Sequence, residues 1–321
     1  MRLVFAGTPE PAVVALERLM ASEHEVVGVI TRPDAPRGRG RKLYPSPVKE
    51  FASQHGLEIL TPSSLKPDTE DGKSLRHSLH SLAPDCIPVV AYGQLITPDL
   101  FTICPHGWVN LHFSLLPAWR GAAPVQAAIA AGDEITGAST FRIEEGLDTG
   151  PVFGTVTERI SPTDTADDLL TRLAHSGAEL LVATMDGISS GELSPSPQRG
   201  DISYAAKLTV ADAAIDWHHP AFGVDRKIRA FTPGPGAWTM CEQQRIKISP
   251  VSIPWSSDYT LDAAGVPPLD PGQVWWNKKH VFVGTGTQPV QLGMVQPQGK
   301  KKMPARDWVR GLHESKELKF S

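Results

Sequence analysis

The chain has 321 residues and a formal net charge of −4 at pH 7; 40% of its residues are hydrophobic and 21% are charged. This length allows two domains, and this composition is ordinary for a soluble globular protein. The acidic balance argues against unspecific coating of nucleic acid, although it allows a local basic patch.

The cysteines and the apolar runs exclude further classes of protein. Cys86, Cys104 and Cys241 are odd in number and far apart, so neither a zinc site nor a disulfide framework is expected. No apolar run approaches the roughly 18 residues that span a bilayer, and the amino-terminal run is too short for a signal peptide. We therefore expect a cytoplasmic protein with no membrane partner.

The first part of the chain predicts alternating strands and helices. Apolar residues are almost continuous at 25–30, which is typical of a parallel strand covered on both faces. The expected strands lie at 3–6, 25–30, 57–59, 86–91 and 108–112, and the expected helices at 11–21 and 47–55. This order predicts an α/β fold with a Rossmann-like, doubly wound, mostly parallel sheet that binds ligands at the carboxyl ends of its strands.

The turn after the first strand lacks the glycine patterns that bind nucleotides. Gly7-Thr8-Pro9 is followed by Glu10, so the Gly-x-Gly-x-x-Gly pattern is absent. The chain also contains no Gly-x-x-x-x-Gly-Lys-Ser/Thr loop. We therefore expect neither a nicotinamide or flavin cofactor nor the use of ATP.

The segment 31–47 is too long and too rich in Pro and Gly for a regular element, and we expect a mobile loop. The basic residues at its tip, with no carboxylate among them, are Arg37, Arg39, Arg41 and Lys42. This feature alone is equally compatible with a solvated charged surface and with a phosphate-binding surface. Glycines between the arginines let the backbone fit phosphates, as contacts with nucleic acid require.

A polar pair interrupts the apolar strand expected at 108–112. Asn110 and His112 are two positions apart, so their side chains emerge on the same face of the strand. Taken alone, this pattern indicates a buried histidine that bonds a backbone carbonyl more often than a catalytic group. An amide that can polarise a carbonyl, beside a group that titrates near neutrality, nevertheless suggests acyl transfer.

A second polar candidate is the loop Gly146-Leu-Asp-Thr-Gly150. Its glycines allow sharp turns and project Asp148 outward. An aspartate between glycines is more often a turn residue. If Asp148 lies near His112, its carboxylate can orient the imidazole and stabilise its protonated form.

The second part of the chain predicts a long helix, a linker and a β-rich domain. An amphipathic helix is expected at 163–187, with Thr163 as its cap, and a Ser/Pro/Gly-rich stretch follows. Short apolar runs separated by turns predict a small, OB-like β-barrel, with strands at 238–241, 246–248, 272–275, 281–284 and 290–294. We expect a catalytic domain at 1–188, a linker at 189–206 and a β-barrel domain at 207–321. The barrel domain carries a second basic cluster with Lys300, Lys301 and Lys302.

Several of these segments together resemble the methionyl-tRNA formyltransferase family of enzymes that use 10-formyltetrahydrofolate. The matching motifs extend over almost the entire chain: FAGTPE at 5–10, RGRGRKLYPSPVKE at 37–50, VVAYGQLI at 89–96, NLHFSLLPAWRGAAPVQ at 110–126, IEEGLDTGPV at 143–152, YAAKL at 204–208, IDW at 215–217, IRAFTPGPGAW at 228–238 and GKKKM at 299–303. The central motifs are specific for folate-dependent formyl transfer. The arginine-rich segment and the second domain narrow the resemblance to the tRNA enzymes.

The resemblance implies roles for individual residues of this chain. The catalytic residues would be Asn110, His112 and Asp148. Folate would contact Ser114, Leu115, Leu116 and Pro117, and the backbone of Ala91, Tyr92, Gly93, Gln94, Leu95 and Ile96. The tRNA would contact Arg37, Arg39, Arg41, Lys42, Lys300, Lys301 and Lys302, with Arg39 nearest the acceptor end. Phe113 stands where a small residue is common in the family.

The implied reaction is direct transfer of a formyl group from 10-formyltetrahydrofolate to the α-amine of initiator methionyl-tRNA, for translation initiation. Asn110 and protonated His112 would stabilise the tetrahedral oxyanion, while Asp148 orients His112 and assists proton movement. No metal and no covalent intermediate on the enzyme are expected, and a monomer is expected. The alternatives are a formyltransferase for a small amine, such as glycinamide ribonucleotide or an amino sugar nucleotide, and a non-catalytic RNA-binding protein.

Overall fold

The computed structural model describes residues 1–37, 40, 42–254, 265–312 and 318–321. Its internal contacts divide the chain into two compact units. Unit 1 comprises residues 1–124, 135–159 and 170–205, and unit 2 comprises residues 125–134, 160–169 and 206–321. Among the described residues, none of the helices is long and apolar enough to cross a membrane.

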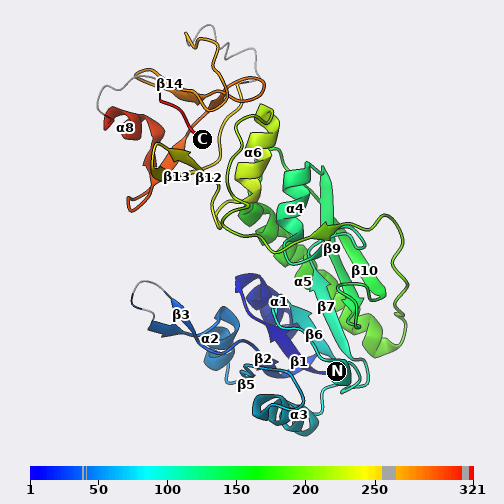
Figure 1. Ribbon diagram of the computed structural model, residues 1–321. Coiled ribbons are helices and arrows are strands. Elements are labelled where there is room, and N and C mark those ends of the chain that lie inside the picture. Colours follow the sequence, from blue (N-terminus) through cyan, green and yellow to red (C-terminus); the bar gives the residue numbers. More distant parts are fainter. Residues whose placement is uncertain (38–39, 41, 255–264, 313–317) are drawn as a thin grey trace. The chain divides into compact units, whose positions relative to one another are not determined.

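Unit 1 is built on a seven-stranded sheet with the strand order β10-β9-β7-β6-β1-β2-β5 (Figure 1). Its strands are β1 (Arg2–Gly7), β2 (Glu25–Ile30), β5 (Glu58–Leu60), β6 (Ile87–Val90), β7 (Trp108–His112), β9 (Ile135–Arg142) and β10 (Val152–Arg159). Neighbouring strands from β5 to β7 are parallel, whereas β9 and β10 are antiparallel. The order reverses between β1 and β6, which confirms the predicted doubly wound, mostly parallel sheet.

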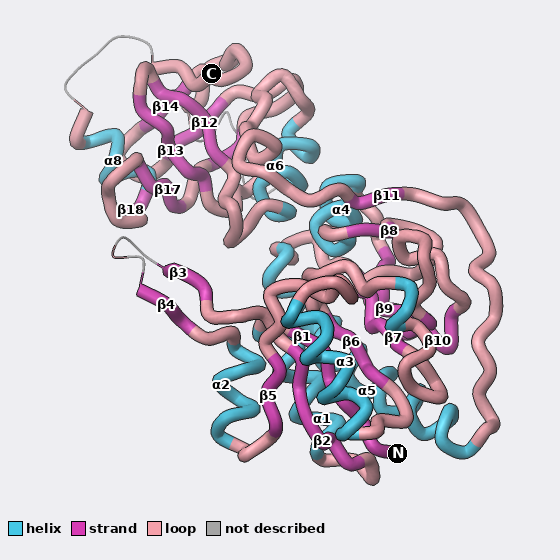
Figure 2. The backbone as a smooth tube through the Cα atoms, turned by 60° about the horizontal axis from the view of Figure 1, so that its bottom comes forward, coloured by secondary structure: helices cyan, strands magenta, loops and turns pink. Residues whose placement is uncertain are grey.

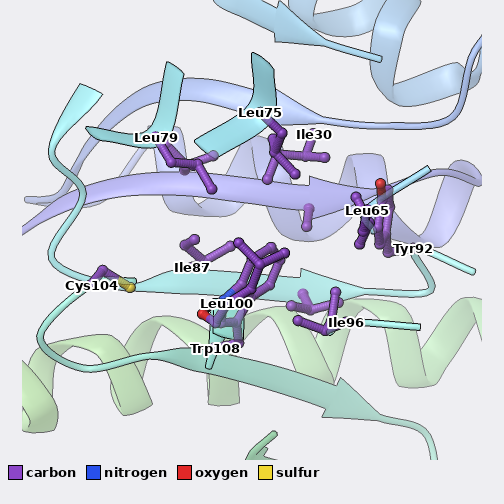
Figure 3. Close-up of a cluster of buried hydrophobic side chains, with 13 residues drawn as sticks. Ile30, Leu65, Leu75, Leu79, Ile87, Tyr92, Ile96, Leu100, Cys104 and Trp108 are labelled. Atoms are coloured by element: carbon purple, nitrogen blue, oxygen red, sulfur yellow. Dashed lines mark hydrogen bonds between the residues drawn. The ribbon is translucent and has the colours of Figure 1, made fainter. Parts of the chain in front are cut away.

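Helices cover both faces of this sheet. They are α1 (Glu10–Met20), α2 (Pro47–Gln54), α3 (Glu70–Leu82) and α5 (Ala166–Ser190), whose part from Leu170 onward belongs to unit 1. On one face, Leu75 and Leu79 of α3 join a buried cluster with Trp108 of β7 (Figure 3). On the other face, a Cβ built on Gly177 of α5 would lie 3.0 Å from Leu111. Because Trp108 and Leu111 are an odd number of positions apart on the strand, their side chains point to opposite faces of the sheet. Strand β7 is therefore covered on both sides.

The segment 31–47 differs from its expectation. It contains β3 (Ala35–Arg37) and β4 (Lys42–Tyr44), which pair as an antiparallel hairpin that projects beyond α2 (Figure 2). The prediction of no regular element was therefore wrong. Ala35 and Tyr44 lie opposite each other, and each precedes a proline, which restricts both residues to extended backbone.

The long helix α5 begins later than predicted. Its first helical residue is Ala166, and Thr165 rather than Thr163 caps it. The Asp168 amide donates to Thr165 Oγ1 at 3.3 Å, while the Thr165 amide donates to Asp168 Oδ2 at 3.0 Å. This reciprocal pair satisfies two backbone donors at the helix start.

Unit 2 contains two antiparallel sheets and short helices. One sheet has the order β12-β13-β17-β18 and the other the order β14-β15-β16. Their bounds are β12 Trp238–Cys241, β13 Gln244–Ile248, β14 Val274–Trp276, β15 Val281–Val283, β16 Val290–Gln291, β17 Met294–Pro297 and β18 Met303–Pro304; the helices are α4 (Pro124–Ala131, from Val125 onward), α6 (Ala221–Ala230) and α8 (Ala305–Arg310). The Phe320 ring lies 5.6 Å from that of Trp217 and 5.8 Å from that of Trp308. The predicted antiparallel strand content of the second domain is confirmed.

Candidate active site

A cleft of about 530 Å³ lies in unit 1 at the carboxyl ends of β6 and β7. Doubly wound sheets bind ligands in this position, next to the point where the strand order reverses. The volume falls within the range of roughly 300–1,000 Å³ that is usual for small-molecule sites. The predicted residues that line it are Asn110, His112, Asp148, Ala91, Tyr92, Gly93, Gln94, Leu95 and Ile96.

Strand β7 carries two of the predicted catalytic residues into this cleft. Asn110 lies opposite Val89 of β6 and Phe141 of β9, near the middle of the sheet. His112 is the last residue of β7, and its side chain is only 6% exposed. The period-two pattern of β7 places both side chains on one face, as the sequence predicts.

The two ring nitrogens of His112 have different partners. Nε2 donates to the carbonyl oxygen of Trp119 at 2.9 Å. Because a carbonyl only accepts, Nε2 carries the proton in the neutral imidazole. Nδ1 faces Asp148 Oδ2 at 3.7 Å, which is too long for a direct hydrogen bond.

Asp148 is held in an unusual backbone conformation. Its φ of 51° lies in the left-handed region, which is uncommon for a residue other than glycine. Its Oδ2 accepts a hydrogen bond of 2.7 Å from the Gly121 amide, in the short strand β8 (Arg120–Gly121). The carboxylate is 15% exposed, so little water screens its charge from His112.

Burial sets the protonation state of His112. Burial lowers the pKa of His112 below its usual value, although the Asp148 carboxylate and the hydrogen bond to the Trp119 carbonyl act in the opposite direction. The neutral ring presents the lone pair of Nδ1 toward Asp148. Such a nitrogen can accept a proton, and the carboxylate beside it stabilises the imidazolium that forms.

The segment after β6 forms one wall of the cleft. The Thr8 hydroxyl donates to the Tyr92 carbonyl at 3.0 Å, and Gln94 Nε2 donates to the Pro62 carbonyl at 2.9 Å. Leu95 is 84% exposed, and Leu147, on the loop that carries Asp148, is 59% exposed. Exposed apolar side chains at the rim of a cleft are typical of ligand-binding grooves.

The other predicted folate residues do not line the cleft. Ser114, Leu115, Leu116 and Pro117 form the turn that follows β7. The Ser114 hydroxyl donates to the Ala118 carbonyl, and the Leu116 amide donates to the hydroxyl of Ser139. These bonds brace the turn that leads to Trp119. Their contact with folate stays a prediction.

The basic residues predicted to bind tRNA belong to both units. Arg37 ends β3 and Lys42, which is exposed, begins β4 in unit 1. Arg39 and Arg41 lie outside the described residues. Lys300, Lys301 and Lys302 of unit 2 are exposed in the turn between β17 and β18.

Sequence reasoning missed part of this site. Glu144 and Glu145 line the cleft, as do Gly121 and Ala122. The neighbouring Gly-Leu-Asp-Thr-Gly loop was a usable signal for the two glutamates. Gln198, which bonds the backbone of that loop, lies in the predicted linker, where no pattern indicates a role. Within the described part of the chain, no group of three His, Cys, Asp or Glu side chains could hold a metal ion.

Comparison with known proteins identifies the family. A family model for formyl transferases matches residues 1–185, and a model for the formyl transferase C-terminal domain matches residues 207–313. The methionyl-tRNA formyltransferase of Corynebacterium glutamicum (strain R) is 61% identical over 320 residues, which cover 100% of both chains. The chain belongs to the methionyl-tRNA formyltransferase family.

Solved structures share the fold of this formyltransferase at low sequence identity. The sugar 3N-formyl transferase WlaRD, in the presence of dTDP and 5-N-formyl-THF, has a TM-score of 0.66 at 17% identity, covering 94% of this chain and 99% of its own. The methionyl-tRNA formyltransferase from Clostridium thermocellum has a TM-score of 0.54 at 16% identity, covering 79% of this chain and 93% of its own. These likenesses concern the fold alone.

Proposed function

We propose that this formyltransferase transfers a formyl group from 10-formyltetrahydrofolate to the α-amine of initiator methionyl-tRNA. Full-length identity of 61% to a methionyl-tRNA formyltransferase supports the acceptor. The observation that carries the chemistry is the facing pair of His112 Nδ1 and Asp148 Oδ2 in a cleft that Asn110 also lines. The enzyme would act in the cytoplasm, where charged tRNA is used.

The cleft has the lining that a folate needs. A reduced pterin carries hydrogen-bonding edges, and residues 91–96 lie along one wall. The exposed side chains of Leu95 and Leu147 can cover the apolar part of such a ligand. We infer that these residues hold the co-substrate. The bound 10-formyltetrahydrofolate supplies the formyl group.

Asn110, His112 and Asp148 have different roles in the proposed reaction. Asn110 donates its amide N–H to the formyl oxygen as negative charge develops there, and one such donor contributes about 3–4 kcal/mol. His112 Nδ1 accepts the proton that the attacking amine releases. Asp148 stabilises the imidazolium, which supports the oxyanion and then returns the proton to the departing nitrogen.

This order of events adds a first step to the mechanism expected from the sequence. That mechanism has protonated His112 stabilise the oxyanion and leaves the source of its proton open. Burial favours the neutral ring in the free protein, and Nε2 already donates to the Trp119 carbonyl. His112 therefore acts first as a base at Nδ1 and only afterwards as a cation.

The basic residues of both units would bind the tRNA phosphates. Lys42 is exposed on β4, and its neighbours Leu43 and Tyr44 are exposed as well. A cation beside an exposed aromatic ring suits contact with a phosphate and an unpaired base. Lys300, Lys301 and Lys302 would contribute further phosphate contacts.

A formyl-transfer assay tests the proposal directly. The protein, 10-formyltetrahydrofolate and charged initiator tRNA should yield formylmethionyl-tRNA, whereas glycinamide ribonucleotide and amino sugar nucleotides should not be formylated. A preference for a small amine would overturn the proposed acceptor. Binding of charged tRNA without transfer would instead indicate an RNA-binding protein.

A further inference from the structure

The segment 196–205 packs on the elements that carry the candidate catalytic residues. Ser196 exchanges two backbone hydrogen bonds of 2.8 Å with Val152, at the start of β10. The short strand β11 (Tyr204–Ala205) pairs in parallel with β8 (Arg120–Gly121), whose Gly121 amide binds Asp148. All of these residues belong to unit 1. The sequence predicted a linker here, and the two family models leave this stretch unmatched.

Gln198 joins the two loops of the site through its side-chain amide. Its Nε2 donates to the carbonyl oxygen of Asp148 at 2.7 Å and to that of Gly150 at 2.8 Å. Its Oε1 accepts from Nη2 of Arg120 at 2.7 Å and from Nε at 3.1 Å. Carbonyls only accept and a guanidinium only donates, so these four contacts leave one orientation for the amide.

Arg120 is an unusual partner for this amide. Its guanidinium is buried, with the residue only 7% exposed. A buried cation needs a partner, and the Gln198 oxygen accepts from two of its nitrogens. The charge therefore fixes Gln198, and Gln198 in turn fixes the carbonyls of the Asp148 loop.

The Asp148 loop needs such support. Asp148 has a φ of 51°, and a residue other than glycine keeps a left-handed conformation only where surrounding contacts impose it. The Gly121 amide holds the carboxylate, and Gln198 holds the backbone on both sides of Thr149. The two contacts are made by different atoms of Asp148, so losing one leaves the other in place.

We propose that Gln198 is a positioning residue for formyl transfer, because it fixes the backbone of the Asp148 loop and thereby sets the carboxylate beside His112. This inference rests on the proposed function. Gln198 does not line the cleft, so it acts on the reaction through Asp148 and not through the bound co-substrate.

Two substitutions separate the contacts of Gln198. Gln198→Met keeps the length of the side chain and removes every hydrogen bond. Gln198→Glu keeps an acceptor for Arg120, but a carboxylate cannot donate to the carbonyls of Asp148 and Gly150. Ser194→Ala, at an exposed position shortly before this segment, is the matched control.

Steady-state kinetics should separate kcat from KM. Small displacements of a catalytic group cost up to roughly 100-fold in rate, so we expect kcat to fall about 10- to 100-fold in both Gln198 variants. The KM for 10-formyltetrahydrofolate should stay within about threefold, because Gln198 does not contact the wall at 91–96 that is proposed to hold the co-substrate. Ser194→Ala should match the wild type. A raised KM with unchanged kcat, or wild-type kinetics in Gln198→Glu, would overturn the inference.

A second readout concerns the free protein and needs no turnover. The His112 ring is followed by NMR against pH and assigned by its absence in His112→Gln. A loosened Asp148 supports the imidazolium less, so the titration midpoint should fall in Gln198→Met, which adds no charge near the ring. An unchanged or raised midpoint in folded Gln198→Met would overturn the positioning role. Lack of formyl transfer by the wild type would instead contradict the proposed function.

Discussion

His112 Nδ1 faces Asp148 Oδ2 at 3.7 Å, while the proton of the neutral ring is held on the opposite nitrogen by the Trp119 carbonyl. The imidazole therefore turns its basic atom toward a partly buried carboxylate. This arrangement costs energy while the ring is neutral and becomes favourable when the ring gains a proton. In the proposed mechanism, this arrangement would favour the step in which the acceptor amine loses a proton.

Replacing Asp148 by asparagine should reduce turnover without unfolding the protein. The amide oxygen can still accept from the Gly121 amide, but the negative charge beside Nδ1 is lost. Positioned acid–base partners contribute roughly 10²- to 10⁴-fold in rate, so kcat should fall within that range. Formyl transfer and thermal unfolding are measured together. Turnover within threefold of the wild type would contradict the role of Asp148.

Replacing Asn110 by alanine should also lower kcat. The variant loses an amide donor toward the reacting carbonyl, and loss of one such donor costs about 10²- to 10³-fold. Asn110 lies in the middle of β7 and pairs through its backbone, so the sheet should persist. A kcat equal to that of the wild type, together with a raised KM, would show that Asn110 binds the substrate without stabilising the transition state.

The pH dependence of His112 has a defined sign. Burial lowers the pKa of His112, so its midpoint in the free protein should lie below about 6.5, the value of an exposed histidine. NMR titration of the ring measures it. In the unfolded chain the ring binds a proton at higher pH than in the folded protein. The free energy of unfolding should therefore decrease as the pH falls from about 6.5 toward the pKa of His112 in the folded protein. This decrease should be smaller in His112→Gln.

The basic residues should act on tRNA binding and its salt dependence. Lys42→Ala and the triple replacement of Lys300, Lys301 and Lys302 should each raise the KM for charged tRNA. Each lost phosphate contact should reduce the slope of log K against log salt by roughly 0.7–0.9. Folate affinity should not change. Lys73→Ala, on the exposed surface of α3, is the control, and an equal effect there would remove any special role for the two basic sites.

The core beneath the cleft should respond strongly to truncation. Leu79 of α3 is buried in the cluster that includes Ile87 and Trp108 (Figure 3). Leu79→Ala should reduce the free energy of unfolding by about 2–5 kcal/mol, through lost burial and the cavity left behind. Urea unfolding measures the change. Ile202→Ala, at an exposed position, should change it by less than about 0.5 kcal/mol.

The sequence predicts the parallel strands well because their apolar residues are almost continuous. The bounds expected for β2 and β7 agree with the structure, and β12 in unit 2 is also predicted to the residue. Helix α3 was not predicted. Its sequence EDGKSLRHSLHSL is mostly polar, and among its side chains only the buried leucines indicate the face that packs on the sheet. Such a helix depends on tertiary contacts more than on its own pattern.

The site was predictable where its residues are close in sequence or carried by a family motif. Asn110 and His112 share one strand, so their common face follows from the backbone period. The distance between His112 and Asp148 depends on a left-handed turn and on contacts made by residues far along the chain. Gln198 is 50 residues from Asp148 and lies among Ser, Pro and Gly, so composition gave no sign of it.

The attachment of residues 196–205 to unit 1 decides where the polypeptide can be shortened. A fragment that stops at residue 188, where the first domain was expected to end, would lose both the β11 pairing and the amide that binds the Asp148 loop. A fragment that runs through Ala205 would keep them.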